Sequence, residues 1–308
     1  MATNSSKRVL ITGASGLLGR AVLEAFIAAG WHSTGLAFSR ADRHPNLVKA
    51  DLCDPVAMEK LIDDLKPNVI VHCAAERSPD AVDQKPAETF QLNVQSTQHL
   101  SQCAKNVGAF LLYISTDYVF DGNAPPYTED ATPHPINKYG ESKLAGEEAA
   151  VSVYPDAVIL RVPVLYGPVE KLSESAVTVL FEKLLEGPTG KPAVMSHYER
   201  RYPTHVADIA KALVLLATLK LQGEEIRGVY HWSGKDCLTK YEMVQHMSKI
   251  FGLPMDHVVA DATKPTSGAA RPYDAALSCS RLEKLGAPTP MSFADGISSV
   301  LSPFARKA

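Results

Sequence analysis

Residues 8–22 read RVLITGASGLLGRAV, a short apolar run followed by a glycine-rich turn and the start of a helical pattern. The apolar run predicts a buried strand, and residues 17–30 repeat their apolar side chains at the period of a helix. Between the two, Gly13, Gly16 and Gly19 give the spacing GxxGxxG. One glycine permits positive φ in the turn, another lets a pyrophosphate approach the backbone, and a third packs the helix against the strand. The stretch therefore predicts either a phosphate-binding turn at a helix N-terminus or, as the alternative, a glycine-rich turn without a ligand.

The alternation of apolar runs and helical patterns continues to residue 167. Near-continuous apolar strands separated by helices are typical of a parallel sheet that is covered on both faces. The sequence therefore predicts an α/β fold, a Rossmann-type doubly wound parallel sheet over residues 1–167. The expected strands are 8–13, 32–38, one before Asp51, 68–75, 109–116 and 156–167, and the expected helices are 17–30, 55–66, 86–108 and 138–153.

The regular alternation ends beyond residue 167. Residues 168–308 are expected to form a smaller C-terminal lobe for a substrate or partner, partly interleaved with the sheet and forming one wall of a cleft. Its predicted elements are helices at about 173–186, 206–219 and 239–251 and a strand at 228–234, with an irregular segment at 261–286.

Composition excludes several classes of function. The chain has 308 residues, 45% of them hydrophobic and 21% charged, and its net charge of −3 gives no case for binding nucleic acid or an anionic membrane. The N-terminal MATNSSKR is not expected to be a signal peptide, and the longest apolar run, 212–219, is too short to cross a bilayer. Cysteines 53, 73, 103, 237 and 279 are scattered, which predicts free thiols, no metal site and a cytoplasmic location.

Tyr139 and Lys143 lie four residues apart in INKYGESKLAGEEA (136–149), so a helix there would carry both side chains on one face. Thr116, at the end of a predicted strand, would reach the same edge of the sheet. A phenol has a pKa of ~10 and needs a nearby ammonium to favour its anion at neutral pH, and Lys143 could supply that charge. The pair is then an acid catalyst, a clamp for a bound cofactor, or a plain surface pair on an amphipathic helix.

The glycine spacing, together with Thr116, Tyr139 and Lys143, resembles the short-chain dehydrogenase/reductase superfamily. The resemblance implies that a nicotinamide dinucleotide lies across the carboxyl ends of the strands. Thr116 would then bind the substrate oxygen, and Tyr139 would donate a proton as hydride arrives from the cofactor. Lys143 would also bind the nicotinamide ribose.

The second strand ends in AFSRADR (37–43), where an acidic residue would bind the ribose 2′-hydroxyl of NAD. Arg40 favours a 2′-phosphate instead, so the expected cofactor is NADP; the alternative is a solvated surface arginine. Cys73, with Ala74 and Ala75, is expected to be a small wall residue. The cofactor-binding residues that the resemblance implies are Gly13, Ser15, Gly16, Leu17, Leu18, Gly19, Phe38, Ser39, Arg40, Asp51, Leu52, Cys73, Arg77, Tyr139, Lys143 and Leu165.

Two groups within the superfamily are similar to this sequence. ISTDYVFDG (114–122) and PINKYGESKLAGE (135–147) resemble the dTDP-4-dehydrorhamnose reductases, which reduce a 4-keto nucleotide sugar with NADPH. A closer resemblance, over about residues 8–300, is to the regulatory β subunits of methionine adenosyltransferase. It is carried in the second lobe by ESAVTVLFEK, RYPTHVADIA and YHWSGKDCLTKYEM.

The closer resemblance implies a non-catalytic, NADP-binding protein that docks on the catalytic subunit of methionine adenosyltransferase as a hetero-oligomer and modulates S-adenosylmethionine synthesis. The alternative is an NADPH-dependent reductase of a nucleotide-sugar ketone. The regulatory subunits end in a longer tail with aromatic and basic residues that contributes to docking, whereas this sequence stops at LSPFARKA, with Phe304, Arg306 and Lys307.

Other residues invite functional interpretations. His197, Arg200, Arg201 and His205, in HYERRYPTHVADIA, predict either a loop packed over the cleft or a contact with substrate or partner. The two histidines are not expected to bind a metal, because no carboxylate motif accompanies them. Trp232 is expected in the core.

Overall fold

The computed structural model describes residues 7–187 and 192–305. Two parts of the sequence analysis lie outside these described residues. They are the first six residues of the N-terminal stretch, which is not expected to be a signal peptide, and the C-terminal Arg306 and Lys307. The centre of the fold is a seven-stranded parallel sheet in the order β10-β6-β5-β4-β1-β2-β3. The strands are β1 (Arg8–Thr12), β2 (His32–Ala37), β3 (Leu47–Lys49), β4 (Val69–His72), β5 (Phe110–Thr116), β6 (Val158–Val162) and β10 (Gly228–His231).

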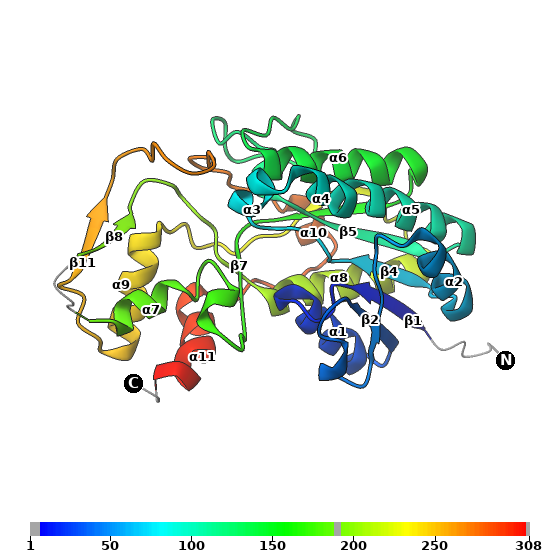
Figure 1. Cartoon of the computed structure of the whole chain (residues 1–308), viewed down its shortest axis with the longest axis horizontal. Coiled ribbons are helices and arrows are strands. Elements are labelled where there is room, and N and C mark those ends of the chain that lie inside the picture. The colour runs from blue at the N-terminus through cyan, green and yellow to red at the C-terminus, as the bar shows by residue number, and fades with distance from the viewer. Residues whose placement is uncertain (1–6, 188–191, 306–308) are drawn as a thin grey trace.

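Helices cover both faces of this sheet, as Figure 1 shows. Successive strand residues point to opposite faces, so Leu10 packs with α2 (Pro55–Leu65) and α5 (Ser96–Val107), while Ile11 packs with α1 (Leu17–Ala28) and α8 (Val206–Leu221). Helix α6 (Lys138–Val153) packs beside α5 on the first of these faces. The predicted doubly wound α/β fold is therefore confirmed.

The order of the strands sets the position of the cleft. β1 pairs with β2 on one side and with β4 on the other. The connections after β1 therefore run towards one edge of the sheet, and those after β4 run towards the opposite edge. In open α/β sheets ligands bind outside the carboxyl ends of the strands at such a switch point.

The second lobe has a core of its own. It consists of α7 (Leu180–Leu185), α9 (Lys240–Phe251), α11 (Phe293–Ala305) and the parallel pair β8 (Ala193–Ser196) and β11 (Val258–Asp261). Phe181, Met243, Val244 and Phe293 are among its buried side chains. The lobe lies at the end of the molecule away from α2 (Figure 1). Residues beyond 167 also supply α8 and β10 to the sheet half, because the chain crosses back after β9 (Thr204–His205).

The structure divides two elements that the sequence predicts as continuous. The strand expected at 156–167 is β6 followed by a separate β7 (Leu165–Tyr166), which pairs with β9. Pro163, between them, has no N–H for a strand ladder. The helix expected at 173–186 is a short 3-10 turn, η4 (Leu172–Glu174), followed by α7. Between them the Ser175 hydroxyl donates to the Leu165 carbonyl and accepts from the Val177 amide, which competes with helical hydrogen bonds.

The helix expected at 86–108 contains a π-helical turn (Gln91–Gln95) between α4 (Pro86–Phe90) and α5. Asn93 in this turn accepts from the Glu76 amide and donates to the Glu76 carbonyl and to Ser142. Such turns inside α-helices are frequently found at functional sites. The remaining short elements are α3 (Pro79–Gln84), α10 (Ser280–Lys284), and the 3-10 turns η1 (Ala41–Arg43) and η3 (Asp117–Val119). The sequence prediction did not include β8, β11, α10 or α11.

Candidate functional site

A cleft of about 890 Å³ opens at the carboxyl ends of the sheet strands, between the sheet and the second lobe. Its walls contain residues of the loops after β1, β2, β4 and β6 and residues of α6 and α9. Thr116 and every sequence-predicted cofactor-binding residue line it: Gly13, Ser15, Gly16, Leu17, Leu18, Gly19, Phe38, Ser39, Arg40, Asp51, Leu52, Cys73, Arg77, Tyr139, Lys143 and Leu165. The structure therefore gathers the predicted set into one site, while their binding of a cofactor stays a prediction.

The glycine turn is held by close backbone contacts. Gly13 has φ +63°, and a Cβ there would lie 2.9 Å from the Ala74 backbone. A Cβ on Gly19 would lie 2.2 Å from the Gly13 carbonyl oxygen. Gly16 caps α1 without a side-chain hydrogen bond. The first amides of α1 thus face the cleft without a capping side chain, an arrangement that suits a diphosphate.

The loops after β2 and β3 form one end of the cleft. Arg40 and Ser39 line it, and Phe38 has 66% of its surface exposed. The Asp51 carboxylate accepts a hydrogen bond from the Cys53 amide, which fixes the turn after β3. An exposed aromatic ring beside an arginine can contact an adenine and a phosphate.

Thr116 and Tyr139 both line the cleft, and Tyr139 packs edge-on against Tyr118 with 5.9 Å between the ring centroids. Burial raises the pKa of Tyr139 above its ordinary value, and a hydrogen bond with Thr116 and the charge of Arg77 act in the opposite direction. The phenol is therefore protonated at neutral pH and can serve as a hydrogen-bond or proton donor.

Lys143 has a partner that the sequence did not indicate. Its Nζ donates to the Tyr113 hydroxyl at 2.6 Å and lies 4.1 Å from the centroid of that ring. Burial lowers the pKa of Lys143 to about 7, and the negative charge of Glu147 opposes that shift. The expected effect of Lys143 on Tyr139 stays a prediction, because in the structure the amine faces Tyr113.

The pKa of Lys143 predicts a pH dependence of stability. Between pH 7 and the ordinary lysine value of 10.5, the unfolded chain holds this proton and the folded chain does not. Unfolding then takes up a proton, so the free energy of unfolding rises with pH in this window by up to ~1.4 kcal/mol per pH unit. We expect the stability of the wild type relative to Lys143→Met to rise between pH 7 and 9 in urea unfolding. Lys138→Met, at an exposed position of α6, is the control, and a flat difference for Lys143→Met would contradict the assignment.

Four cations line the part of the cleft towards the second lobe: Arg77, Arg201, Lys240 and Arg271. Arg201 is 7% exposed, its Nη1 donates to the Pro272 carbonyl, and its Nη2 has no hydrogen-bond partner among the described residues. Burial, followed by the charge of Arg271, lowers the pKa of Lys240. Four positively charged side chains in one part of the cleft wall would attract a second anionic group.

Other predicted candidates have structural roles. Burial raises the pKa of Cys73 to about 12, so this wall residue is a neutral thiol. His197 bonds to the Thr239 hydroxyl, and His205 accepts from the Ala207 amide at the start of α8. The prediction that Trp232 lies in the core is confirmed, since it is 1% exposed. Arg200 is exposed and donates to the Cys237 sulfur, so of the loop 197–205 only Arg201 lines the cleft.

Sequence reasoning missed Tyr113, Lys240 and Arg271 as cleft or cleft-supporting residues. Tyr113 lies within a strand whose residues are all buried, so no alternation marked its hydroxyl. Lys240 opens α9, and Arg271 is in a segment without regular structure. Tyr113 meets Lys143 because α6 packs on β5, whereas the positions of Lys240 and Arg271 depend on how the second lobe packs. No local pattern carries that information. Among the described residues no helix is long and apolar enough to cross a membrane, and no His/Cys/Asp/Glu cluster suits a metal ion.

Comparison with known proteins places this geometry in a family. The model of the RmlD substrate binding domain matches residues 7–306. Methionine adenosyltransferase 2 subunit beta of Xenopus laevis is 47% identical over 302 residues, covering 98% of this chain and 89% of the relative. A dTDP-4-dehydrorhamnose reductase of Aggregatibacter actinomycetemcomitans is 30% identical over 90% of this chain and 92% of its own length. The crystal structure of the Bacillus anthracis dTDP-4-dehydrorhamnose reductase in complex with NADP superposes with a TM-score of 0.82 at 25% identity, over 97% of this chain and 99% of that one.

Proposed function

The chain belongs to the RmlD substrate binding domain family and, within it, to the methionine adenosyltransferase 2 beta subunits, and we propose that it is the NADP-binding regulatory subunit of a methionine adenosyltransferase. In this function it is non-catalytic. It docks on the catalytic subunit as a hetero-oligomer and modulates S-adenosylmethionine synthesis.

One observation carries this proposal. The beta subunits match 98% of the chain at 47% identity, compared with 30% over 90% for the reductase. The match therefore includes the second lobe with α7, α9 and most of α11, where a partner or substrate would be selected. The five cysteines, all free, suit the cytoplasm as the location.

The proposed cofactor, NADP, fits the shape and chemistry of the cleft. Its volume of about 890 Å³ is within the range of small-molecule and cofactor sites. The glycine turn offers amides to the diphosphate, and Arg40 offers a guanidinium to the 2′-phosphate. Tyr139 and Lys143 would hold the nicotinamide ribose. The Bacillus anthracis relative is described in complex with NADP, which supports the same cofactor here.

Arg40→Ala is expected to weaken NADP binding by ~1–3 kcal/mol, the cost of one charge-assisted contact, and to leave NAD binding nearly unchanged. Isothermal titration calorimetry with both nucleotides measures this difference. Lys60→Ala, which removes an exposed positive charge from α2, is the control. An equal loss of affinity for both nucleotides would refute the assignment of Arg40.

Association tests the regulatory function directly. The purified chain is expected to form a complex with a methionine adenosyltransferase catalytic subunit at micromolar concentration, seen by size-exclusion chromatography with light scattering, and to change its kinetics towards methionine and S-adenosylmethionine. A bacterial dTDP-4-dehydrorhamnose reductase, which shares the fold, is the matched control and should do neither. Absence of a complex would remove the proposal.

A second function is favoured by two features of the cleft. Thr116, Tyr139 and Lys143, the residues of the predicted reductase-type set, all line the cleft, and the cations around Arg201 could hold an anionic substrate. The alternative is an NADPH-dependent reductase of a nucleotide-sugar ketone. If the chain is such a reductase, NADPH absorbance should fall when a dTDP-4-keto-6-deoxy sugar is added. The Tyr139→Phe variant should abolish that fall. No turnover with the wild type would exclude this reaction.

A further inference from the structure

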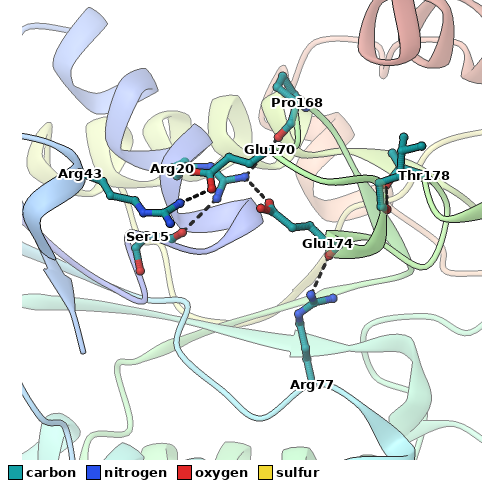
Figure 2. A network of polar contacts seen from close by, with 9 residues as sticks. Ser15, Arg20, Arg43, Arg77, Pro168, Glu170, Glu174 and Thr178 are labelled. Carbon is teal, nitrogen blue, oxygen red and sulfur yellow. Dashed lines mark hydrogen bonds and ion pairs between the residues drawn. The ribbon is translucent and has the colours of Figure 1, made fainter. Parts of the chain in front are cut away.

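The segment 168–174 lies beside helix α1 and the loop after β4, and arginines of the sheet half hold it there (Figure 2). Arg20 of α1 donates to the Ser15 carbonyl at 3.0 Å, to the Glu174 carboxylate at 2.7 Å and to the Pro168 carbonyl at 3.3 Å. Arg77 donates to the backbone carbonyl of Glu174 at 2.7 Å. The segment is thus tied to α1 and to the loop after β4, both of which contribute residues to the cleft wall.

Glu170 in this segment has a different partner, in the turn η1 that follows the cleft-lining residues Ser39 and Arg40. Its carboxylate forms an ion pair with Arg43 of η1, three residues after Arg40. Both side chains are about half exposed. The hydrogen bond from Arg43 lowers the pKa of Glu170 most, and the charges of Arg43, Arg20 and Arg40 act in the same direction. An intramolecular carboxylate therefore lies within the field of the arginine to which the 2′-phosphate is assigned.

We propose that Glu170 and the 2′-phosphate of NADP compete for Arg43, so that Arg43 is a second phosphate-binding residue after Arg40 and Glu170 lowers the preference for NADP over NAD. This inference rests on the proposed binding of NADP. It adds two specificity-determining residues, one of them from a segment 127 positions away along the chain.

The relative charges decide the outcome of this competition. A phosphate monoester carries about −1.5 to −2 charges at neutral pH and three acceptor oxygens, against one charge on a carboxylate. Arginine binds phosphate through two parallel hydrogen bonds, so the phosphate displaces Glu170 from Arg43. NAD has only a hydroxyl at this position, which cannot displace a carboxylate from an arginine. Glu170 thus reduces the affinity for NADP and leaves the affinity for NAD unchanged.

The test is calorimetric titration of NADP and NAD, at low ionic strength, into the wild type, Glu170→Gln, Arg43→Ala and the double variant. Exposed ion pairs of this kind are worth about a two- to fivefold change in an equilibrium constant, so Glu170→Gln should bind NADP about two- to fivefold more tightly and NAD as the wild type does. Arg43→Ala should weaken NADP binding selectively. The gain in NADP affinity from Glu170→Gln should be smaller when Arg43 is also replaced by Ala. It should also be smaller in 0.5 M salt, because the charges are exposed.

Glu186→Gln is the matched control, because Glu186 forms a similarly exposed ion pair with Lys183 in the second lobe. It should change neither affinity. An unchanged NADP affinity in Glu170→Gln, an equal gain for NADP and NAD, or a full gain without Arg43 would overturn the inference while leaving the proposed cofactor intact. A wild type that does not bind NADP would overturn both.

Discussion

Glu147→Ala is expected to lower the free energy of unfolding by ~3–5 kcal/mol, because it leaves a buried guanidinium without its counter-charge. Glu147 of α6 accepts two hydrogen bonds from Arg161 of β6, at 2.9 and 2.7 Å. The Arg161 side chain is 4% exposed and the Glu147 side chain 6%. Arg161 also lies over the Phe120 ring, and its Nη1 has no hydrogen-bond partner among the described residues.

We expect the loss of stability to come from the unpaired charge of Arg161 and not from the loss of the carboxylate itself. The double variant Glu147→Leu, Arg161→Met removes both charges and fills similar space, so most of the stability should return. Glu88→Ala, which breaks the exposed pair with Lys85, is the control and should cost only a small fraction of the buried effect. Urea unfolding of the four proteins measures the differences. If Glu147→Ala costs no more than Glu88→Ala, the pair does not stabilise the fold.

Gly19→Ala is expected to abolish dinucleotide binding. The added Cβ would lie 2.2 Å from the Gly13 carbonyl oxygen and 2.7 Å from the Ala14 Cα, both of which are backbone atoms that no rotamer change can move. Helix α1 must then separate from the turn, and its first amides leave the diphosphate. Losing two charge-assisted hydrogen bonds of ~1.5–3 kcal/mol each corresponds to at least about a 100-fold weaker affinity.

A matched glycine separates lost binding from lost stability. Gly30, just after α1, has φ +78° and open space around a Cβ, so Gly30→Ala strains the backbone without touching the turn. It should lower stability by ~1–2 kcal/mol and leave NADP binding intact. Calorimetry on both variants, with circular dichroism to verify folding, makes the comparison. A folded Gly19→Ala protein that binds NADP within about tenfold of the wild type would show that this contact does not shape the site.

The sequence determined the elements that depend on neighbours along the chain. The helix expected at 138–153 is α6 with the same bounds, and the Asn137 side chain caps its start by accepting a hydrogen bond from the Gly140 amide. The strand expected at 156–167 was correct only to Val162, since its apolar character continues past Pro163 while the chain leaves the sheet. Hydrophobicity predicts burial, but it does not tell which sheet a buried residue joins.

Within the site, local patterns and family resemblance predicted the glycine spacing, the position of Arg40 and the separation of Tyr139 from Lys143. Backbone geometry fixes each of these over a few residues. Only the tertiary structure decided which distant groups meet. Lys143 faces Tyr113, 30 positions away, and Glu170 reaches Arg43 across 127 positions. The first pairing follows from how α6 packs on β5, and the second from how the segment 168–174 lies on the sheet half. Packing sums many weak contacts that no short stretch of sequence contains.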